Sequence, residues 1–355
     1  MDQAFPIPIP DAIPVSPTFL EIPLILLFVL HLLLMNAVVG ACIIGLFCPA
    51  RPAPCVRLAA GVAHRVPTIL ALTINLGVAP LLFLQALYGQ FFFTSSVLMA
   101  SWWLAVVLIL LVAYYGLYYH DLGFTSPTPA RKVVLACSLG LLLMVAFIFV
   151  NNMTLMLQPE RWQEMVASPG EFFLNLADPV VLPRFLHFMT AALAVGGMFI
   201  ALVWRRKSLS GDAEALAIVS RGLKWFIGAT MAQLCFGSLF LFFLPGQIRS
   251  LLLGGSAAHT GTFGFGLAMA ALAVVLAAKR KVALAAAALV LSVTGMAMVR
   301  DLVRKAYLSP FFTLDDLPVT GDSSSLVFFL ASLAFGAACL AYLLKLSNKA
   351  GSAQG

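Results

Sequence analysis

Charged residues are scarce in this chain: Asp, Glu, Lys and Arg make up only 10% of its 355 residues, against about 25% in soluble domains. Hydrophobic residues make up 62%, and the mean hydropathy is +1.03. This composition excludes an ordinary soluble domain. The formal net charge of +7 is a signal of membrane topology, and we expect no nucleic-acid partner. We therefore predict a multi-pass membrane protein.

Signals of several other protein classes are also missing. Residues 1–17 are rich in proline and contain no Lys or Arg, so we predict no cleavable signal peptide. The six cysteines are scattered, and no C-x-x-C-H stretch occurs, which excludes covalently attached c-type haem. Cys48 and Cys55 could form a metal or redox pair, but no matching ligands stand near them in the sequence. No internal repeat and no soluble domain is evident.

Long apolar segments dominate the chain instead. A membrane helix needs about 20 largely apolar residues, and nine stretches qualify: 19–48, 66–91, 97–119, 132–157, 181–204, 222–245, 261–279, 282–300 and 325–346. We predict an all-α fold with one nine-helix membrane domain over 19–346, flanked by tails at 1–18 and 347–355. Residues 158–180 predict short interfacial helices, and 306–324 an irregular cap.

The basic residues predict the orientation of these helices, because cytoplasmic loops are enriched in Lys and Arg. With the N-terminus outside and the C-terminus inside, the inner loops carry fifteen of the 21 basic residues and the outer side carries six. The outer six are Arg161, Arg184, Arg249, Arg300, Arg304 and Lys305. We expect this orientation in the inner (cytoplasmic) membrane of a bacterial cell.

The predicted topology separates the five histidines into two groups. His64 and His120 fall in inner loops, where we expect solvated or interfacial side chains. His31 and His187 fall in the outer half of the first and fifth spans, and His259 falls at the outer entrance of the seventh. Polar residues at membrane depth usually face the interior of a helix bundle. These three are either hydrogen-bonded bundle residues or axial ligands of one or two haem groups.

His187 has the most suggestive surroundings. At helical spacing, Arg184 precedes it by one turn, and Thr190, Ala191 and Ala194 follow on the same face. That face offers a ring nitrogen for iron, small residues beside which a porphyrin could lie, and a guanidinium for a propionate.

Further candidates are less distinctive. His259 is either a ligand or a residue near the start of the seventh helix. Met269 lies in the same helix, and a thioether can also bind haem iron. Arg300 is a second candidate for a propionate. On the outer loop, Asp178, Glu164 and Glu171 could accept protons from a quinol.

Several motifs resemble those of subunit I of the cytochrome bd family of quinol oxidases, over nearly all nine predicted spans. The resemblance is carried by the segments His31–Gly40, Asn75–Ala79, Gln158–Pro159, Asn175–Pro179, Phe185–His187 and Gly197–Ile200. It implies that His31 binds a high-spin haem and His187 a low-spin b haem. The family's second low-spin ligand is a methionine, whose place falls on Ala268, next to Met269; His259 could substitute for it.

The chain departs from that family where protons and quinol are handled. The two glutamates of the family's third helix fall on Ala105 and Ala113, and the eighth helix keeps Arg300 but has no acid inside the membrane. The family has a long quinol loop between the sixth and seventh spans, whereas this chain has only a short segment there. Reduction of oxygen consumes protons at a buried site, and only ionisable or hydrated groups deliver them there.

We therefore expect a haem-b membrane subunit of a respiratory complex. It would transfer electrons between the quinone pool and a periplasmic-side redox partner, such as a c-type cytochrome, together with other membrane subunits. One alternative is a divergent cytochrome bd-type quinol oxidase subunit I. The other is a haem-free structural or assembly subunit.

Overall fold

The computed structural model describes residues 7–163 and 174–321, and scattered helical positions from 324 to 345. The long helices are α1 (Pro17–Leu46), α2 (Ala53–Asp121), α3 (Pro129–Leu155), α5 (Val181–Leu209), α6 (Ala213–Phe243), α8 (Ala257–Ala278) and α9 (Val282–Leu308). Short helical turns are η1 (Pro159–Arg161), α7 (Gly246–Ser250), η2 (Leu251–Gly255) and η3 (Leu314–Asp316). The described residues contain no β-strand, only one isolated bridge between Ile13 and Val319.

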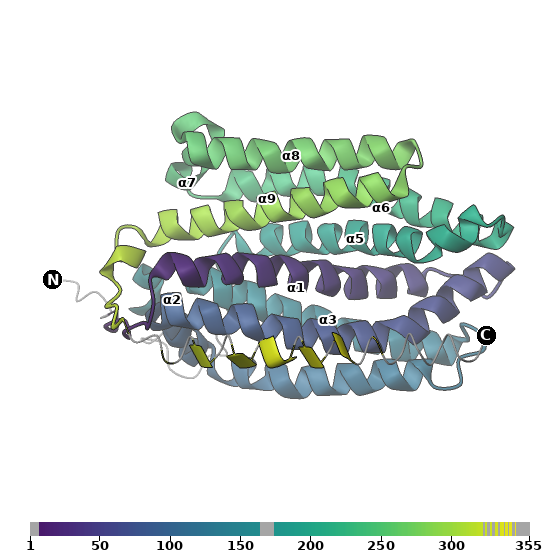
Figure 1. Cartoon of the computed structure of the whole chain (residues 1–355), viewed down its shortest axis with the longest axis horizontal. Helices are drawn as coiled ribbons and strands as arrows, with labels where there is room; N and C mark the ends of the chain where they lie inside the picture. The colour runs from purple at the N-terminus through teal and green to yellow at the C-terminus, as the bar shows by residue number, and fades with distance from the viewer. Residues whose placement is uncertain are drawn as a thin grey trace.

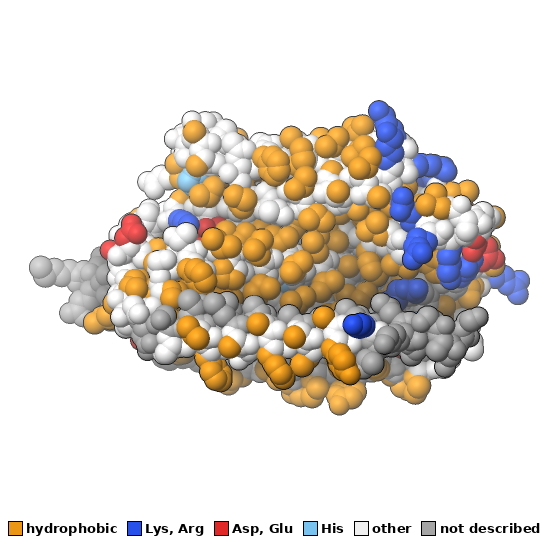
Figure 2. Space-filling view, in the orientation of Figure 1, with side chains coloured by type: hydrophobic (Ala, Val, Ile, Leu, Met, Phe, Trp, Pro, Cys, Tyr) orange, Lys and Arg blue, Asp and Glu red, His pale blue; other side chains and the backbone are white. Residues whose placement is uncertain are grey.

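Seven of these helices are long and apolar enough to cross a membrane, among the residues that are described. Their exposed side chains are largely aliphatic and aromatic, and Figure 2 shows an orange surface along the middle of the molecule. The chain is therefore an all-α, multi-pass membrane protein whose apolar helices contact lipid. The predicted ninth span, 325–346, is described only at scattered helical positions.

Helix α2 is bent back on itself. Its 69 residues would form a straight rod of about 100 Å, far longer than a bilayer core of about 30 Å. The backbone leaves helical geometry at Tyr88 (φ −137°, ψ 31°) and at Ala100 (φ 32°, ψ −101°). His64 and Asp121, 57 residues apart, are hydrogen-bonded. The helix is thus two antiparallel arms joined by residues 89–99, which we call the corner segment.

The helices form two groups that meet along α1 and α5. Helices α1, α2 and α3 pack on one side, and α5, α6, α8 and α9 on the other (Figure 1). Gly40 and Gly196 lie at the crossing of α1 and α5, where a Cβ on Gly196 would come within 2.5 Å of the Gly40 Cα. Only glycine permits this backbone contact.

Predicted loops on the same side of the membrane meet at the same end of the molecule. At one end, Arg57 forms an ion pair with Asp212 at 2.7 Å. This end holds most of the Lys and Arg side chains visible in Figure 2. At the other end, the Ile13 N–H donates to Pro318 at 2.8 Å, so the N-terminal segment joins the cap that follows α9.

Two predictions about these ends need correction. Helix α9 continues to Leu308, so the irregular cap begins later than residue 306. His120 is buried and not solvated, because its ring packs on Phe124 and its Nδ1 lies 3.0 Å from the Arg131 carbonyl.

Candidate functional site

His31 packs against a glycine of the neighbouring helix. Its ring lies on Gly77 of α2, where a Cβ would come within 2.6 Å of Cε1 and 2.7 Å of Nδ1. Its Nδ1 lies 3.0 Å from the carbonyl oxygen of Thr73. A carbonyl can only accept a hydrogen bond, so Nδ1 carries the proton and Nε2 keeps its lone pair.

His187 has the same kind of neighbour in the other helix group. Its ring lies on Gly237 of α6, where a Cβ would be 3.1 Å from both Cε1 and Nδ1. The Phe240 ring lies 5.9 Å away, centroid to centroid, and the backbone of Gln233 is in hydrogen-bonding reach. The His187 Nδ1 is buried and makes no hydrogen bond of normal geometry among the described residues, although the Gln233 backbone lies near the ring. Such an atom usually has a partner in a folded protein.

The two histidines occupy equivalent positions relative to the α1–α5 crossing. Gly40 follows His31 by nine residues, and Gly196 follows His187 by nine. Nine residues of α-helix turn through about 900°, which is half a turn beyond two full turns. Each histidine therefore points away from the crossing and into its own helix group. No repeat is evident in the sequence, because apart from the histidine and the glycine the two helices share only a few common apolar residues.

The seventh-span candidates lie in α8. His259 is in its first turn, with Nδ1 2.9 Å from the Ser256 hydroxyl, and its Nε2 is buried without a partner among the described residues. Ala268 is exposed, whereas Met269 is half-buried. Of these two neighbours, Met269 is thus the one that faces other parts of the protein.

The two predicted propionate partners are both found near the histidines. Arg184 is only 7% exposed, donates to the Thr154 hydroxyl at 2.8 Å and lies 5.3 Å from the Phe240 ring. Arg300 stacks at 4.4 Å over Phe28, one turn before His31 in α1. Neither guanidinium has a carboxylate within 4 Å in the described part of the chain.

The sequence analysis missed a buried ionic cluster beside Arg300. Asp301 and Arg304 are both buried and lie 3.1 Å apart, and Lys305 bonds to Asp301 at 3.1 Å and to Glu21 of α1. Arg304 stacks at 5.1 Å over Tyr88, at the kink in α2. Spacings of three and four residues among charged groups near a helix end were the available signal.

The loop before α5 is held by its own polar side chains. Asp178 is 4% exposed and accepts hydrogen bonds from the Gln158 amide at 2.6 Å and the Val180 N–H at 2.8 Å. Asn175 accepts from Arg161 at 2.7 Å. These contacts connect the end of α3 to the start of α5 and thereby position His187. Glu164 and Glu171 lie outside the described residues.

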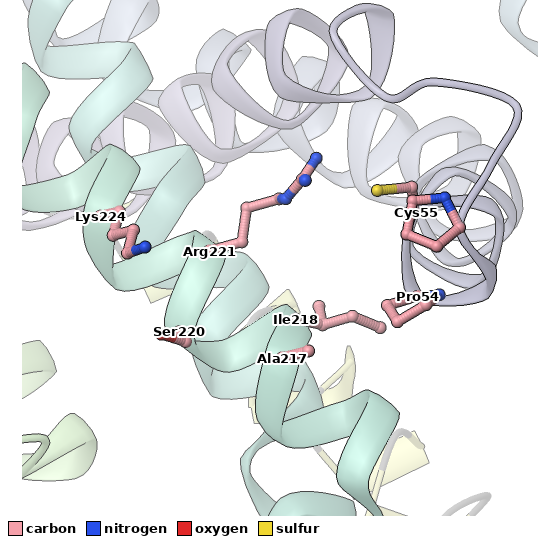
Figure 3. Close-up of a pocket in the computed structure, with 8 residues that line it drawn as sticks. Pro54, Cys55, Ala217, Ile218, Ser220, Arg221 and Lys224 are labelled. Atoms are coloured by element: carbon pink, nitrogen blue, oxygen red, sulfur yellow. The ribbon is translucent and has the colours of Figure 1, made fainter.

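One cavity lies far from the candidate histidines. It has a volume of about 420 Å³ and lies between the start of α2 and the start of α6, lined by Pro54, Cys55, Ile218, Arg221 and Lys224 among others (Figure 3). Arg221 is sixteen residues before Gly237, so the cavity is about 24 Å from His187 along α6. Cys48 and Cys55 are both buried and unbonded, and no group of three metal-binding side chains occurs in the described chain.

A second cavity lies at the opposite end, against the corner segment of α2. It has a volume of about 270 Å³ and is lined by Asp11, Ala12, Ile13, Pro14, Gln85, Ala86, Gly89, Gln90 and Phe93.

Comparisons with protein families, curated proteins and solved structures found no match for this chain.

Proposed function

We propose that this protein is a haem-b subunit of a membrane-bound respiratory complex. It exchanges electrons between the quinone pool and a periplasmic-side redox partner, such as a c-type cytochrome. The single observation that carries the proposal is the pair of histidines, one in each helix group, each facing a glycine of the adjoining helix.

The surroundings of His31 suit an axial ligand. Metal-binding histidines usually donate their other ring N–H to a carbonyl or carboxylate, which fixes the tautomer. The Thr73 carbonyl accepts from Nδ1 in this way and leaves Nε2 for iron. When bound, a b haem supplies one-electron exchange.

The surroundings of His187 suit a ligand for a different reason. Burying a polar atom without a partner costs about 1–3 kcal/mol. A bond to a metal would satisfy the lone pair of Nδ1. His259 and Met269 of α8 are the candidates for the second ligand of this site.

The buried arginines favour an anionic cofactor. A cation in a low-dielectric interior is costly unless it is paired, and Arg300 lies within electrostatic reach of both Arg184 and Arg304. Asp301 is the nearest described carboxylate to Arg304. Haem carries two propionates, and guanidinium groups bind carboxylates in fork geometry. Arg184 and Arg300 would hold them.

The finer topology is part of the same proposal. We infer nine spans, with the cation-rich end inside and the histidines and arginines toward the outside of a bacterial inner membrane. The two arms of α2 and the 325–346 segment complete that count. In this arrangement the propionate partners face the side on which a soluble cytochrome would dock.

The proposal excludes oxygen reduction as the main activity. In the described chain, the buried acids Asp178 and Asp301 lie at the outer end, and the α2 arm that should carry two glutamates has alanines at 105 and 113. Protons from the inner side would have no ionisable relay across the middle of the membrane.

A haem measurement tests the proposal. The purified protein should give a pyridine haemochrome spectrum of b type, and His187→Ala should lose the low-spin component. His64→Ala, at the cation-rich end, is the matched control and should keep the full spectrum. A purified wild-type protein without haem would overturn the proposal. Rapid oxygen consumption with a reduced quinol would favour the oxidase alternative.

A further inference from the structure

The small cavity against the corner segment contains an unsatisfied amide. Gln90 is 7% exposed, and its Nε2 is buried without a hydrogen-bond partner among the described residues. Leaving such a donor unpaired costs about 1–3 kcal/mol. Gln90 lines the cavity, so a rotation of its side chain would bring the amide to an acceptor on a ligand there.

The backbone around Gln90 is shaped to leave this space open. Tyr88 departs from helical geometry two residues before it, so the first arm of α2 ends there. Gly89 has no side chain, and a Cβ at that position would come within 3.2 Å of the Phe93 ring. The kink and the glycine together leave Phe93 and Gln90 lining one cavity.

The lining defines the chemistry of the ligand. Phe93 is about half exposed and offers a flat apolar surface, and Ile13, Pro14 and Ala86 complete the apolar part. The Gln90 amide can donate to a carbonyl or, after rotation, accept from a hydroxyl. Asp11 adds an exposed carboxylate, which accepts hydrogen bonds. A flat ring whose carbonyl becomes a hydroxyl on reduction could bind in both redox states, because the amide can donate to the carbonyl and accept from the hydroxyl.

We infer that this cavity is the binding site for the quinone head group, with Gln90 as its principal hydrogen-bonding residue. The inference rests on the proposed function, because it assigns a site to the quinone named there. This quinone site does not involve the short segment between α6 and α8, which stands where the resembling family has its long quinol loop.

Three side-chain contacts lie on the route from the neighbourhood of the cavity toward His31. Tyr88, two residues before Gln90, lies under Arg304 at 5.1 Å, and Arg304 pairs with Asp301. Arg300, the residue before Asp301, stacks at 4.4 Å over Phe28, one turn before His31. Gln90 itself is thirteen residues from Gly77, about 20 Å along the arm. The ionic cluster thus contacts Tyr88, near the cavity, and follows directly on Arg300, which contacts the helix that carries His31.

Binding of a short-chain benzoquinone and a short-chain naphthoquinone to the protein in nanodiscs would test the inference. Gln90→Leu has nearly the same size but neither donates nor accepts, and we expect its Kd to rise about tenfold or more, equivalent to about 1.4 kcal/mol. Gln247→Leu makes the same change at an exposed position of α7 and should bind as the wild type does. Ala86→Trp, at the exposed rim, should block binding without disturbing the core.

The haem spectrum, recorded on the same samples, separates this inference from the proposed function. If Gln90→Leu and Ala86→Trp both bind quinone with the wild-type Kd, the cavity is not the quinone site, whatever the spectrum shows. If quinone binding depends on Gln90 while the wild type holds no haem, the site stands and the haem proposal fails. Loss of binding in Gln247→Leu as well would overturn the assignment to this cavity.

Discussion

Replacing Gly77 by alanine tests the role of His31 without touching the histidine itself. The added Cβ would lie 2.6 Å from Cε1 and 2.7 Å from Nδ1 of His31. Carbon atoms in good contact are about 3.5–4.0 Å apart. The ring must therefore move by about 1 Å or the helices must separate. Either change stretches the 3.0 Å hydrogen bond to Thr73 beyond normal length.

The energetic cost of this substitution follows from the same geometry. Overpacking a helix interface costs about 1–3 kcal/mol. An alanine in place of glycine would otherwise gain up to about 1 kcal/mol from helix propensity. We expect Gly77→Ala to lower the unfolding temperature modestly and to perturb the absorption and midpoint potential of one haem, while the other haem keeps its spectrum.

The assay compares reduced-minus-oxidised spectra, redox titrations and thermal unfolding of the purified variants. Gly140→Ala in α3 is the matched control, because a Cβ there meets nothing within 4 Å. In α6, Gly237→Ala should perturb the His187 haem, and Gly228→Ala, which also meets nothing within 4 Å, should not. If Gly77→Ala and Gly140→Ala give identical spectra and potentials, His31 is not a haem ligand.

Two further predictions concern stability. Gly196→Ala places a Cβ 2.5 Å from the Gly40 Cα, so the backbone must move. We expect the free energy of unfolding, measured by thermal unfolding, to fall by about 3 kcal/mol. Wild-type stability of this variant would refute the close α1–α5 crossing. The hydrogen bond from Arg57 lowers the pKa of Asp212 to about 2. A carboxylate with a lowered pKa stabilises the fold above its unfolded pKa, near 4, and loses that effect as pH falls toward 2. Asp212→Asn should therefore reduce the unfolding temperature at pH 5–8, with a difference that shrinks below pH 4; a difference independent of pH would contradict the pairing. Glu214 is a more exposed partner of Arg57, at 3.3 Å, so Glu214→Gln should lower the unfolding temperature less than Asp212→Asn does.

The membrane character of the chain followed directly from its composition. Apolar runs of about 20 residues predict helices because a bilayer leaves the backbone no other way to satisfy its hydrogen bonds. The predicted spans at 66–91 and 97–119 correspond to the two arms of α2, which the non-helical residues Tyr88 and Ala100 separate. The prediction of the ninth span, the finer topology and the outer interfacial helices stays a prediction.

The candidate histidines were visible in the sequence, but their surroundings were not. A polar residue within an apolar run already indicates a bundle interior. The sequence could not show that Gly77 and Gly237 lie on the rings of His31 and His187, because these contacts join different helices. Nor could it show that His120 is buried, since that depends on the turn between α2 and α3.

By itself, the sequence determined that this is a helical membrane protein with one cation-rich end and a few histidines at membrane depth, because those properties depend on local composition and helical spacing. Only the tertiary structure decided which groups share a site. Because α1 and α5 cross closely at Gly40 and Gly196, His31 and His187 each point toward the other helices of their own group. The kink at Tyr88 leaves Gln90 in the lining of a cavity. Both depend on how the helices pack, which no single segment of the chain specifies.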